Sequence, residues 1–150
     1  MFFKTLPSSA QRLFARLGRE PGMGQFYLAG GSAAALYLGH RVSVDLDFFA
    51  PRLFEPAAFL PRLEKLGAIT VQQQSAGTFV GLLAKTQVSF FYYGYPLLEA
   101  PAVYRGIRVA SLLDIALMKI TAISQRGRRR DFVDLYFICH EGYSLCDLLR

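Results

Sequence analysis

Two aspartates, one residue apart, stand inside the strand-like run VSVDLDFF, residues 42–49. Strand side chains alternate between faces, so Asp45 and Asp47 are expected on one side, roughly 6.6 Å apart. Carboxylates this close repel each other unless a cation neutralises them. Mg²⁺ takes oxygen ligands and leaves positions for water and phosphate. The pair therefore indicates a site for one or two Mg²⁺ ions. The alternative is a solvated pair with a salt bridge to Arg41.

A glycine-rich turn precedes the acidic pair. The apolar run QFYLA (25–29) leads into Gly30, Gly31 and Ser32, and a short helical stretch follows. Glycines permit a sharp turn and let a ligand approach the backbone. We expect Ser32 to cap the helix, whose N-terminal amides would favour a phosphate. An ordinary strand–helix turn with a serine cap is the alternative.

A second group of charged residues lies in the last third of the chain. Lys119 is predicted mid-helix, where it either extends to solvent or reaches a cleft as a point charge for triphosphate oxygens. Asp134 stands among apolar residues and could pair with Arg130 one turn earlier or belong to a site. Arg41 could hold a phosphate or neutralise the acidic pair. Asp131 is the weaker candidate, because carboxylates are common in the first turn of a helix for dipole reasons alone.

Composition restricts the class of protein. The chain has 150 residues, 53% of them hydrophobic, which suits one domain with a real core. The formal net charge is +6, and the run QRGRRR (125–130) favours an anionic partner, a nucleotide or RNA, with a solvated basic surface as the alternative. Cys139 and Cys146 do not suffice for a disulfide scaffold or a paired zinc site. We find no signal-peptide pattern and no apolar run of about 18 residues, so we expect a cytoplasmic protein without a membrane span.

Several elements must position these residues. We expect a first helix capped by Ser8 or Ser9, strands at 25–29 and 42–49, a helix near 56–67, three strands at 68–74, 78–84 and 87–93, an extended piece at 106–110, a helix capped by Ser111 that ends near Arg126, a helix from Asp131 to about His140, and a last turn after Ser144. Strands first and helices last favour the α+β class. We expect a single domain over 1–150, with a core of about 20–110 and a helical part of about 111–150.

Other side chains are expected to be structural. His40 and His140 have no companions at metal-ligand spacing. The aromatic run from Phe90 to Tyr95 is predicted to form core and sheet surface rather than a base-stacking platform.

Two blocks of the sequence resemble a known family. The Gly-Gly-Ser turn, followed after twelve residues by DLDFF, is similar to the Gly-Ser and Asp-x-Asp motif of polymerase-β-like nucleotidyltransferases. The block LAGGSAAALYLGHRVSVDLDFF resembles the AbiEii-type toxin branch of that superfamily. The block VASLLDIALMKITAISQRGRRRDFVDLY resembles the same branch's Lys-bearing helix and its Arg/Lys-Asp-x-x-Asp-Leu segment. The resemblance implies a mixed twisted sheet flanked by helices, a divalent metal and a nucleoside triphosphate donor.

The resemblance also implies roles for single residues. It places Mg²⁺ at Asp45 and Asp47, the triphosphate at Lys119, and Asp134 against Lys119 or the attacking hydroxyl. It gives nucleotide binding to the glycine-rich turn and its neighbourhood, namely Gly30, Gly31, Ser32 and Arg41. Several members of the family act on tRNA or are toxins neutralised by an antitoxin protein, so RNA and an antitoxin are the implied partners.

One position departs from the family pattern. Many active members carry a third carboxylate on a later strand, and the candidate position here is Ser89. A hydroxyl is a poor metal ligand and a poor base, although Asp134 could take over as base.

Taken together, the residues and the resemblance lead us to expect a Mg²⁺-dependent, toxin-like nucleotidyltransferase that modifies a hydroxyl on tRNA or protein. The alternative is a catalytically impaired nucleotide- or protein-binding module that retains the fold.

Overall fold

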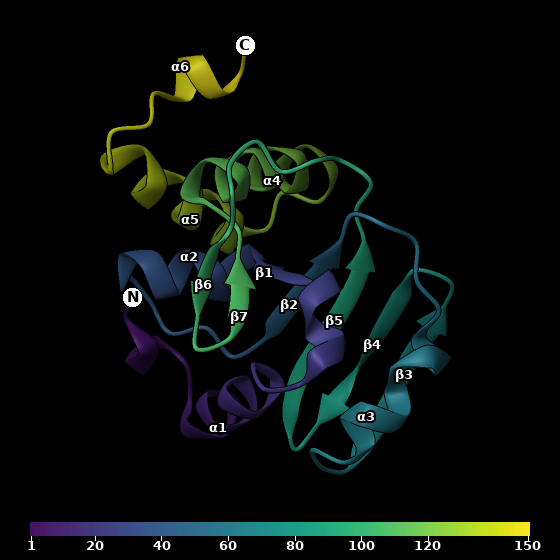
Figure 1. Cartoon of the computed structure of the whole chain (residues 1–150). Helices are drawn as coiled ribbons and strands as arrows, with labels where there is room; N and C mark the ends of the chain where they lie inside the picture. The colour runs from purple at the N-terminus through teal and green to yellow at the C-terminus, as the bar shows by residue number, and fades with distance from the viewer.

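A mixed sheet of seven strands organises the molecule, in the order β3-β4-β5-β2-β1-β7-β6 (Figure 1). The computed structural model describes residues 1–150. The strands are β1 (Tyr27–Ala29), β2 (Leu46–Ala50), β3 (Ile69–Ser75), β4 (Thr78–Leu83), β5 (Thr86–Tyr92), β6 (Ala102–Tyr104) and β7 (Ile107–Val109). β2 runs parallel to β5 and β1 parallel to β7, whereas all other neighbours are antiparallel. The predicted α+β class is confirmed.

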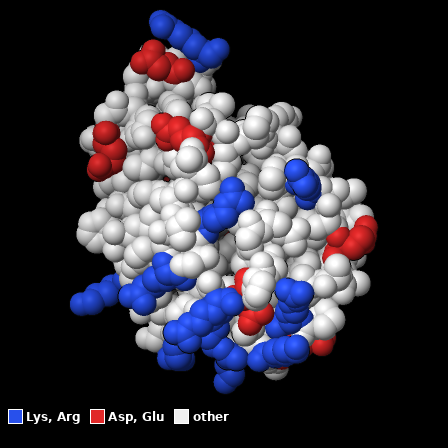
Figure 2. Space-filling view, in the orientation of Figure 1, with Lys and Arg blue, Asp and Glu red and all other residues white.

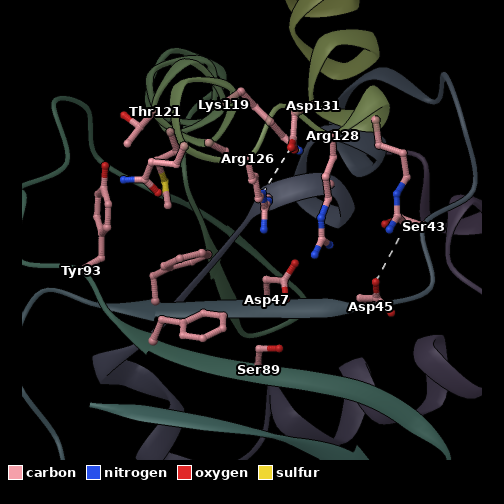
Figure 3. Close-up of a pocket in the computed structure, with 18 of the residues that line it drawn as sticks. Ser43, Asp45, Asp47, Ser89, Tyr93, Lys119, Thr121, Arg126, Arg128 and Asp131 are labelled. Carbon is pink, nitrogen blue, oxygen red and sulfur yellow. Dashed lines mark hydrogen bonds and ion pairs between the residues drawn. The ribbon is translucent and has the colours of Figure 1, made fainter. Parts of the chain in front are cut away.

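Helices cover both faces of this sheet. They are α1 (Ser8–Leu17), α2 (Gly30–Leu38), α3 (Leu60–Glu64), α4 (Leu112–Gln125), α5 (Arg129–His140) and α6 (Leu145–Leu148), with short 3-10 turns η1 (Phe3–Thr5), η2 (Pro21–Gln25) and η3 (Pro56–Ala58). α2, α4 and α5 pack together on one face, and α1 and α3 lie on the other (Figures 1 and 3). No helix is both long enough and apolar enough for a membrane span.

The apolar core includes residues of α2, α4 and α5, but its aromatic part lies on the α1 and α3 side and determines which side chains of β2 face the other way. In β2, Leu46 and Phe48 are fully buried, and Phe48 stacks on Phe90 of β5 with ring centroids 5.0 Å apart. Phe59 packs against Phe90 at 5.0 Å. Each such side chain contributes roughly 1.5–3 kcal/mol when buried. Because strand side chains alternate, burying Phe48 directs Asp47 to the opposite face.

Two predicted helix caps are wrong. The cap residue of α1 is Pro7, and Ser8 already lies inside the helix. The cap residue of α2 is Ala29, so Ser32 is the third residue of the helix rather than its cap. The helix begins three residues earlier than expected, at Gly30, which adopts the left-handed conformation with φ +67° directly after β1.

Other boundaries follow the prediction more closely. Gly39 ends α2 in the left-handed conformation, and the Ser111 hydroxyl accepts a hydrogen bond of 3.1 Å from the Asp114 amide at the start of α4. The hairpin of β4 and β5 is also as expected. The strand expected from residue 42 begins only at Leu46, because the short β1 offers no partner beyond Ala29. β6 was not predicted from the sequence.

Candidate active site

A cavity of about 620 Å³ opens between the sheet and α4, on the face away from the aromatic core (Figure 3). Its volume is in the range of small-molecule sites. β2 and β5 form the floor, α4 and the loop to α5 form the opposite wall, and the start of α2 closes one end. Its polar lining consists chiefly of Gly30, Gly31, Arg41, Asp45, Asp47, Ser89, Lys119, Arg126, Arg128, Arg130 and Asp131.

The acidic pair lies on the floor. Asp47 is in β2, in register with Ser89 on the parallel strand β5, and Asp45 directly precedes β2. Burial raises the pKa of Asp47, and the nearby Asp45 raises it further, while Ser89, Lys119 and Arg126 lower it in part. The net direction is upward. The floor therefore carries negative charge that the protein itself does not balance.

This donor set fits a divalent cation. No group of three or more His, Cys, Asp or Glu side chains is arranged to hold a metal ion, so a metal would rest on the two aspartates with water and substrate. Arg130 Nη1 is 4.0 Å from Asp45 Oδ2 and its side chain is 56% exposed, so this contact neutralises little. Hard carboxylate oxygens with open surroundings suit Mg²⁺, which commonly keeps waters and binds substrate phosphates.

The glycines of the turn are required by their neighbours. A Cβ at Gly30 would lie 3.2 Å from Asp47 Oδ2, and one at Gly31 would collide with the Arg41 guanidinium. Both glycines line the cavity, but Ser32 does not. The Ser32 side chain is buried; its hydroxyl donates to the Asp45 carbonyl and lies 3.0 Å from the Ser43 hydroxyl. Ser32 thus holds the chain before β2 in place.

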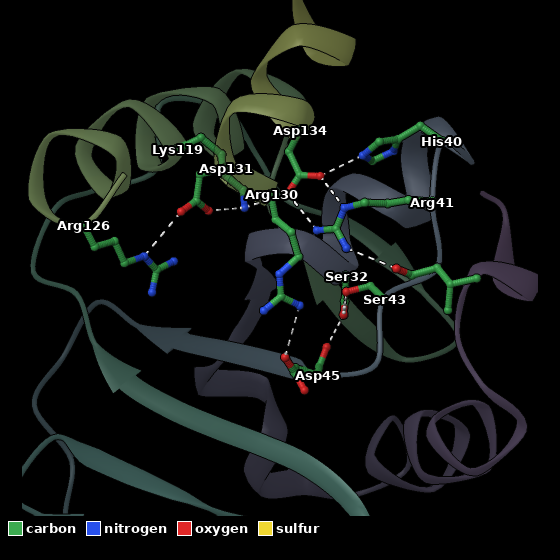
Figure 4. A network of polar contacts seen from close by, with 11 residues as sticks. Ser32, His40, Arg41, Ser43, Asp45, Lys119, Arg126, Arg130, Asp131 and Asp134 are labelled. Carbon is green, nitrogen blue, oxygen red and sulfur yellow. Dashed lines mark hydrogen bonds and ion pairs between the residues drawn. The ribbon is translucent and has the colours of Figure 1, made fainter. Parts of the chain in front are cut away.

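A buried network of charges supports the wall of the cavity (Figure 4). Asp134 is fully buried and accepts hydrogen bonds from Arg41 Nε at 2.6 Å and Nη2 at 2.8 Å. Lys119 Nζ lies 2.7 Å from Asp134 and 2.8 Å from Asp131. His40 Nε2 lies 2.7 Å from Asp134. Burial alone would raise the pKa of Asp134, but Arg41, Lys119 and His40 together lower it.

This network answers two questions that the sequence left open. Asp134 contacts Lys119 rather than Arg130, and Arg41 pairs with Asp134 rather than with Asp45. Lys119 lines the cavity, as does Arg41, but Asp134 does not. Because its oxygens are occupied by cationic partners, Asp134 is poorly placed to accept a proton from a hydroxyl in the cavity.

Sequence reasoning missed the arginines that face the acidic floor. Arg128 forms no ion pair, and its guanidinium points from the loop between α4 and α5 into the cavity (Figure 3). Arg126 is half exposed and lies 3.4 Å from Asp131. The signal was present in the run QRGRRR, but charge alone did not indicate which arginines turn inward. Gly127, with φ +52°, provides the turn between them.

An aromatic wall was missed as well. Phe49 of β2 packs against Phe91 at 5.7 Å and against Tyr93 at 6.0 Å, and all three line the cavity. The run from Phe90 to Tyr95 was expected to be core and sheet surface, which holds for the buried Phe90, whereas the exposed Tyr95 lies beyond the end of β5. Phe91 and Tyr93 lie on the cavity face because side chains alternate along β5 and its continuation.

The family is decided by a match over nearly the whole chain. The model of the nucleotidyl transferase AbiEii toxins of type IV toxin–antitoxin systems matches residues 12–96 and 93–148. The chain belongs to the AbiEii nucleotidyltransferase family. The resemblance seen in the sequence is thereby confirmed. The uncharacterized protein aq_aa25 of Aquifex aeolicus (strain VF5) is 42% identical over 128 residues, which are 82% of this chain and 62% of that relative. The chain thus spans about three-fifths of the relative's length.

Solved nucleotidyltransferase structures share the fold of this AbiEii-family chain. JHP933 from Helicobacter pylori superposes with a TM-score of 0.64 at 22% identity, covering 93% of this chain and 67% of that one. The antibiotic-resistance factor ANT(2'')-Ia gives 0.64 at 18% identity, covering 91% and 83%. The Megavirus polyadenylate synthase gives 0.57 at 11% identity, covering 89% and 32%. The predicted polymerase-β-like fold is confirmed.

Proposed function

We propose that the protein is a Mg²⁺-dependent nucleotidyltransferase that transfers a nucleotidyl group from a nucleoside triphosphate to a hydroxyl. The observation that carries the proposal is the arrangement of charges in one cavity. Asp45 and Asp47 form an acidic floor, and the unpaired Arg128 faces them from the opposite wall. A triphosphate held through a metal ion needs both the carboxylates, which bind the metal, and the cationic side chain, because its oxygens are shared between the metal and cationic groups.

Each group in the cavity has a part in this reaction. Asp45 and Asp47 would hold Mg²⁺, which supplies charge neutralisation and orientation at the phosphates. Arg126 and Arg128 neutralise the outer phosphate oxygens. Lys119 adds positive charge from a position fixed by its carboxylate partners. Electrostatic stabilisation and positioning of this kind supply most of the catalysis in phosphoryl transfer.

The proposed transfer step breaks one phosphorus–oxygen bond, forms another and releases the proton of the acceptor hydroxyl. The acceptor oxygen bonds to the α-phosphorus, the bond from that phosphorus to the bridging oxygen breaks, and pyrophosphate leaves. The hydroxyl proton passes to water, because Asp134 does not line the cavity and both carboxylates of the floor, Asp45 and Asp47, are the proposed metal ligands. The Ser89 hydroxyl is too weak a base for this step.

The nucleobase has a place at the other end of the cavity. Phe49, Phe91 and Tyr93 offer ring faces and edges there. Stacking on aromatic side chains contributes about 1–3 kcal/mol per base and tolerates any base. We assign base binding to this wall, with modest preference among the four nucleotides.

The acceptor and the partner follow from the family and from charge. The arginines from Arg126 to Arg130 at the cavity rim favour an anionic acceptor, and tRNA or another RNA is the first candidate, with protein hydroxyls second. Because the family is described as toxins of type IV toxin–antitoxin systems, we also propose that the protein acts as a toxin and has an antitoxin partner. The reaction would take place in the cytoplasm, where nucleoside triphosphates and tRNA are both present.

The proposal is tested by incubating the protein with labelled nucleoside triphosphates, Mg²⁺ and a tRNA pool. We expect transfer of label to RNA or protein, and no transfer by Asp45→Ala. Melting curves of both proteins establish that the variant is folded. A folded wild type that labels nothing with any nucleotide or divalent metal would contradict the proposal.

One observation favours a second candidate, a module that binds nucleotide without turnover. Only two carboxylates lie on the floor, and Ser89 stands where a third would lie beside them. This reading predicts a rise in melting temperature when nucleotide and Mg²⁺ are both added, without transfer in the labelling assay. A shift accompanied by turnover rejects it.

Arg128→Gln tests the cationic wall. Because Arg128 forms no ion pair in the protein, its loss should leave the melting temperature unchanged. A charge-assisted hydrogen bond contributes about 1.5–3 kcal/mol, so the dissociation constant of the triphosphate should rise about tenfold or more. Titration calorimetry of the wild type, Arg128→Gln and the remote control Arg52→Gln measures this. Equal affinity in all three proteins would place the triphosphate elsewhere.

Ser89→Asp tests the composition of the metal site. Ser89 is paired in register with Asp47 and lines the cavity, so the new carboxylate would join the floor rather than the apolar core. We expect tighter Mg²⁺ binding, together with lower stability in the absence of metal because a third negative charge is added. Calorimetric titration with Mg²⁺ and melting curves with and without metal separate the two effects. Unchanged Mg²⁺ affinity would count against a metal at this floor.

A further inference from the structure

A second concentration of positive charge lies on the face of the sheet opposite the cavity. Arg12 and Arg16 lie one helical turn apart on α1, Arg19 follows just beyond the end of the helix, and all three are exposed. The other side of the same helix is buried against the core through residues such as Phe14 and Leu17. The arginines therefore form a stripe along the outside of α1.

Neighbouring elements extend this stripe into a surface. Arg16 donates to the Leu66 carbonyl at 2.6 Å and to the Lys65 carbonyl at 3.2 Å, which joins α1 to the end of α3. Gly22, shortly after α1, lies beside the Arg62 side chain, and Gly18 lies against the Arg105 carbonyl in the turn between β6 and β7. We call this the α1 basic surface; it consists of Arg12, Arg16, Arg19, Arg62, Lys65 and Arg105. Figure 2 shows Lys and Arg crowded over the part of the molecule that contains α1.

The charge of this surface is not balanced within the protein. None of its basic side chains forms an ion pair, since the cations in the ion pairs of the chain are His40, Arg41, Lys119, Arg126, Arg130 and Arg150. The acidic residues of the same segments are Glu20 and Glu64, and neither forms an ion pair. A field of one sign attracts a polyanion over a distance of about a Debye length.

The chemistry of the surface distinguishes between kinds of polyanion. No large hydrophobic side chain of α1 or α3 is exposed; the exposed aromatic and aliphatic residues lie on other elements, with Val103 of β6 at the edge of the surface and Phe132 and Tyr136 on α5. Protein interfaces depend on buried apolar or aromatic anchors, and membrane-binding helices insert an apolar face. A nucleic-acid backbone needs neither, because phosphates are bound through charge. Arg12 and Arg16 lie about 6 Å apart along the helix axis, and Arg19 continues the stripe beyond the end of α1, so the stripe can meet more than one phosphate.

We propose that the α1 basic surface binds the phosphate backbone of a nucleic acid. It lies across the sheet from the cavity and needs no nucleotide or metal, so it stands independently of nucleotidyl transfer. If the acceptor is RNA, this surface would hold a part of the RNA remote from the reacting hydroxyl.

The test uses the double variant Arg12→Gln/Arg19→Gln, because neither side chain makes a hydrogen bond or ion pair in the protein. Arg52→Gln/Arg150→Gln removes the same charge from exposed positions outside the surface and is the matched control. Fluorescence anisotropy measures binding of labelled single-stranded RNA, duplex RNA and duplex DNA between 50 and 200 mM salt, without nucleotide or Mg²⁺. The three probes distinguish the source of the phosphates.

We expect the affinity of Arg12→Gln/Arg19→Gln for at least one probe to fall about tenfold at low salt, and the salt dependence to flatten by about two phosphate contacts. The control should bind as the wild type does. Equal losses in both double variants, or no binding of any probe by the wild type at 50 mM salt, would overturn the proposal. Binding to anionic lipid vesicles without binding to nucleic acid would overturn it too. Failure of the labelling assay would leave these measurements unaffected.

Discussion

Asp47→Asn is expected to abolish nucleotidyl transfer while making the metal-free protein more stable. Asp47 is a ligand in the proposed metal site, and a bound metal supplies several kcal/mol of transition-state stabilisation, equivalent to about a thousandfold in rate. In the metal-free protein, however, the same carboxylate is half-buried beside Asp45, and its charged form is disfavoured there. Removing that charge should raise the free energy of unfolding by roughly 1 kcal/mol.

Opposite signs for activity and stability make this variant informative. Transfer assays with Mg²⁺ and melting curves in EDTA measure the two quantities on the same preparation. Adding Mg²⁺ should raise the melting temperature of the wild type and leave that of Asp47→Asn nearly unchanged. Ser43→Ala is a suitable comparison, because it alters a neighbouring buried hydroxyl without touching the charge. If Asp47→Asn were both unstable and active, Asp47 would serve the fold rather than the chemistry.

Asp134→Asn is expected to lower the free energy of unfolding by about 3–5 kcal/mol. Asp134 is fully buried and is the shared partner of Arg41, Lys119 and His40. Removing one partner of a buried ion pair leaves the others without compensation, which is the costly way to break such a network. The melting temperature should fall by roughly 10 °C. Asp147→Asn, which removes an exposed carboxylate paired with Arg150 at 3.5 Å, should change it little.

The pH dependence of stability provides a second measure of Asp134. Its folded-state pKa lies below the ordinary value of 3.8 because cationic partners outweigh the effect of burial. A lowered pKa means that this contribution is fully present above the ordinary value and is lost as the pH falls through the folded-state value. The difference in melting temperature between the wild type and Asp134→Asn should therefore be constant near neutral pH and shrink below about pH 4. A difference that persists undiminished at pH 3 would contradict this account.

The sequence alone determined the framework of the site. The alternation in VSVDLDFF placed Asp45 and Asp47 on one face, and the structure puts both on the cavity floor. Ser111 and Asp114 marked the start of α4, and Gly39 marked the end of α2. These features depend on neighbouring residues in the chain: a two-residue period, a capping hydroxyl, and a glycine free to adopt positive φ. Local rules of this kind can be read without knowing what packs against the element.

Only the tertiary structure decided the partners of the charged groups. Arg41 and Asp134 are 93 residues apart in sequence, and their pairing arises because α5 packs against α2. The same packing buries Asp134 away from the cavity, whereas Arg128, three residues before Asp131, turns into it. Side-chain pairing over long sequence separations depends on how the helices and strands pack together. That packing is determined by the burial of their apolar faces rather than by the charged residues that become paired. For that reason the motifs indicated the chemistry, while the assignment of each charge to substrate or to fold required the three-dimensional arrangement.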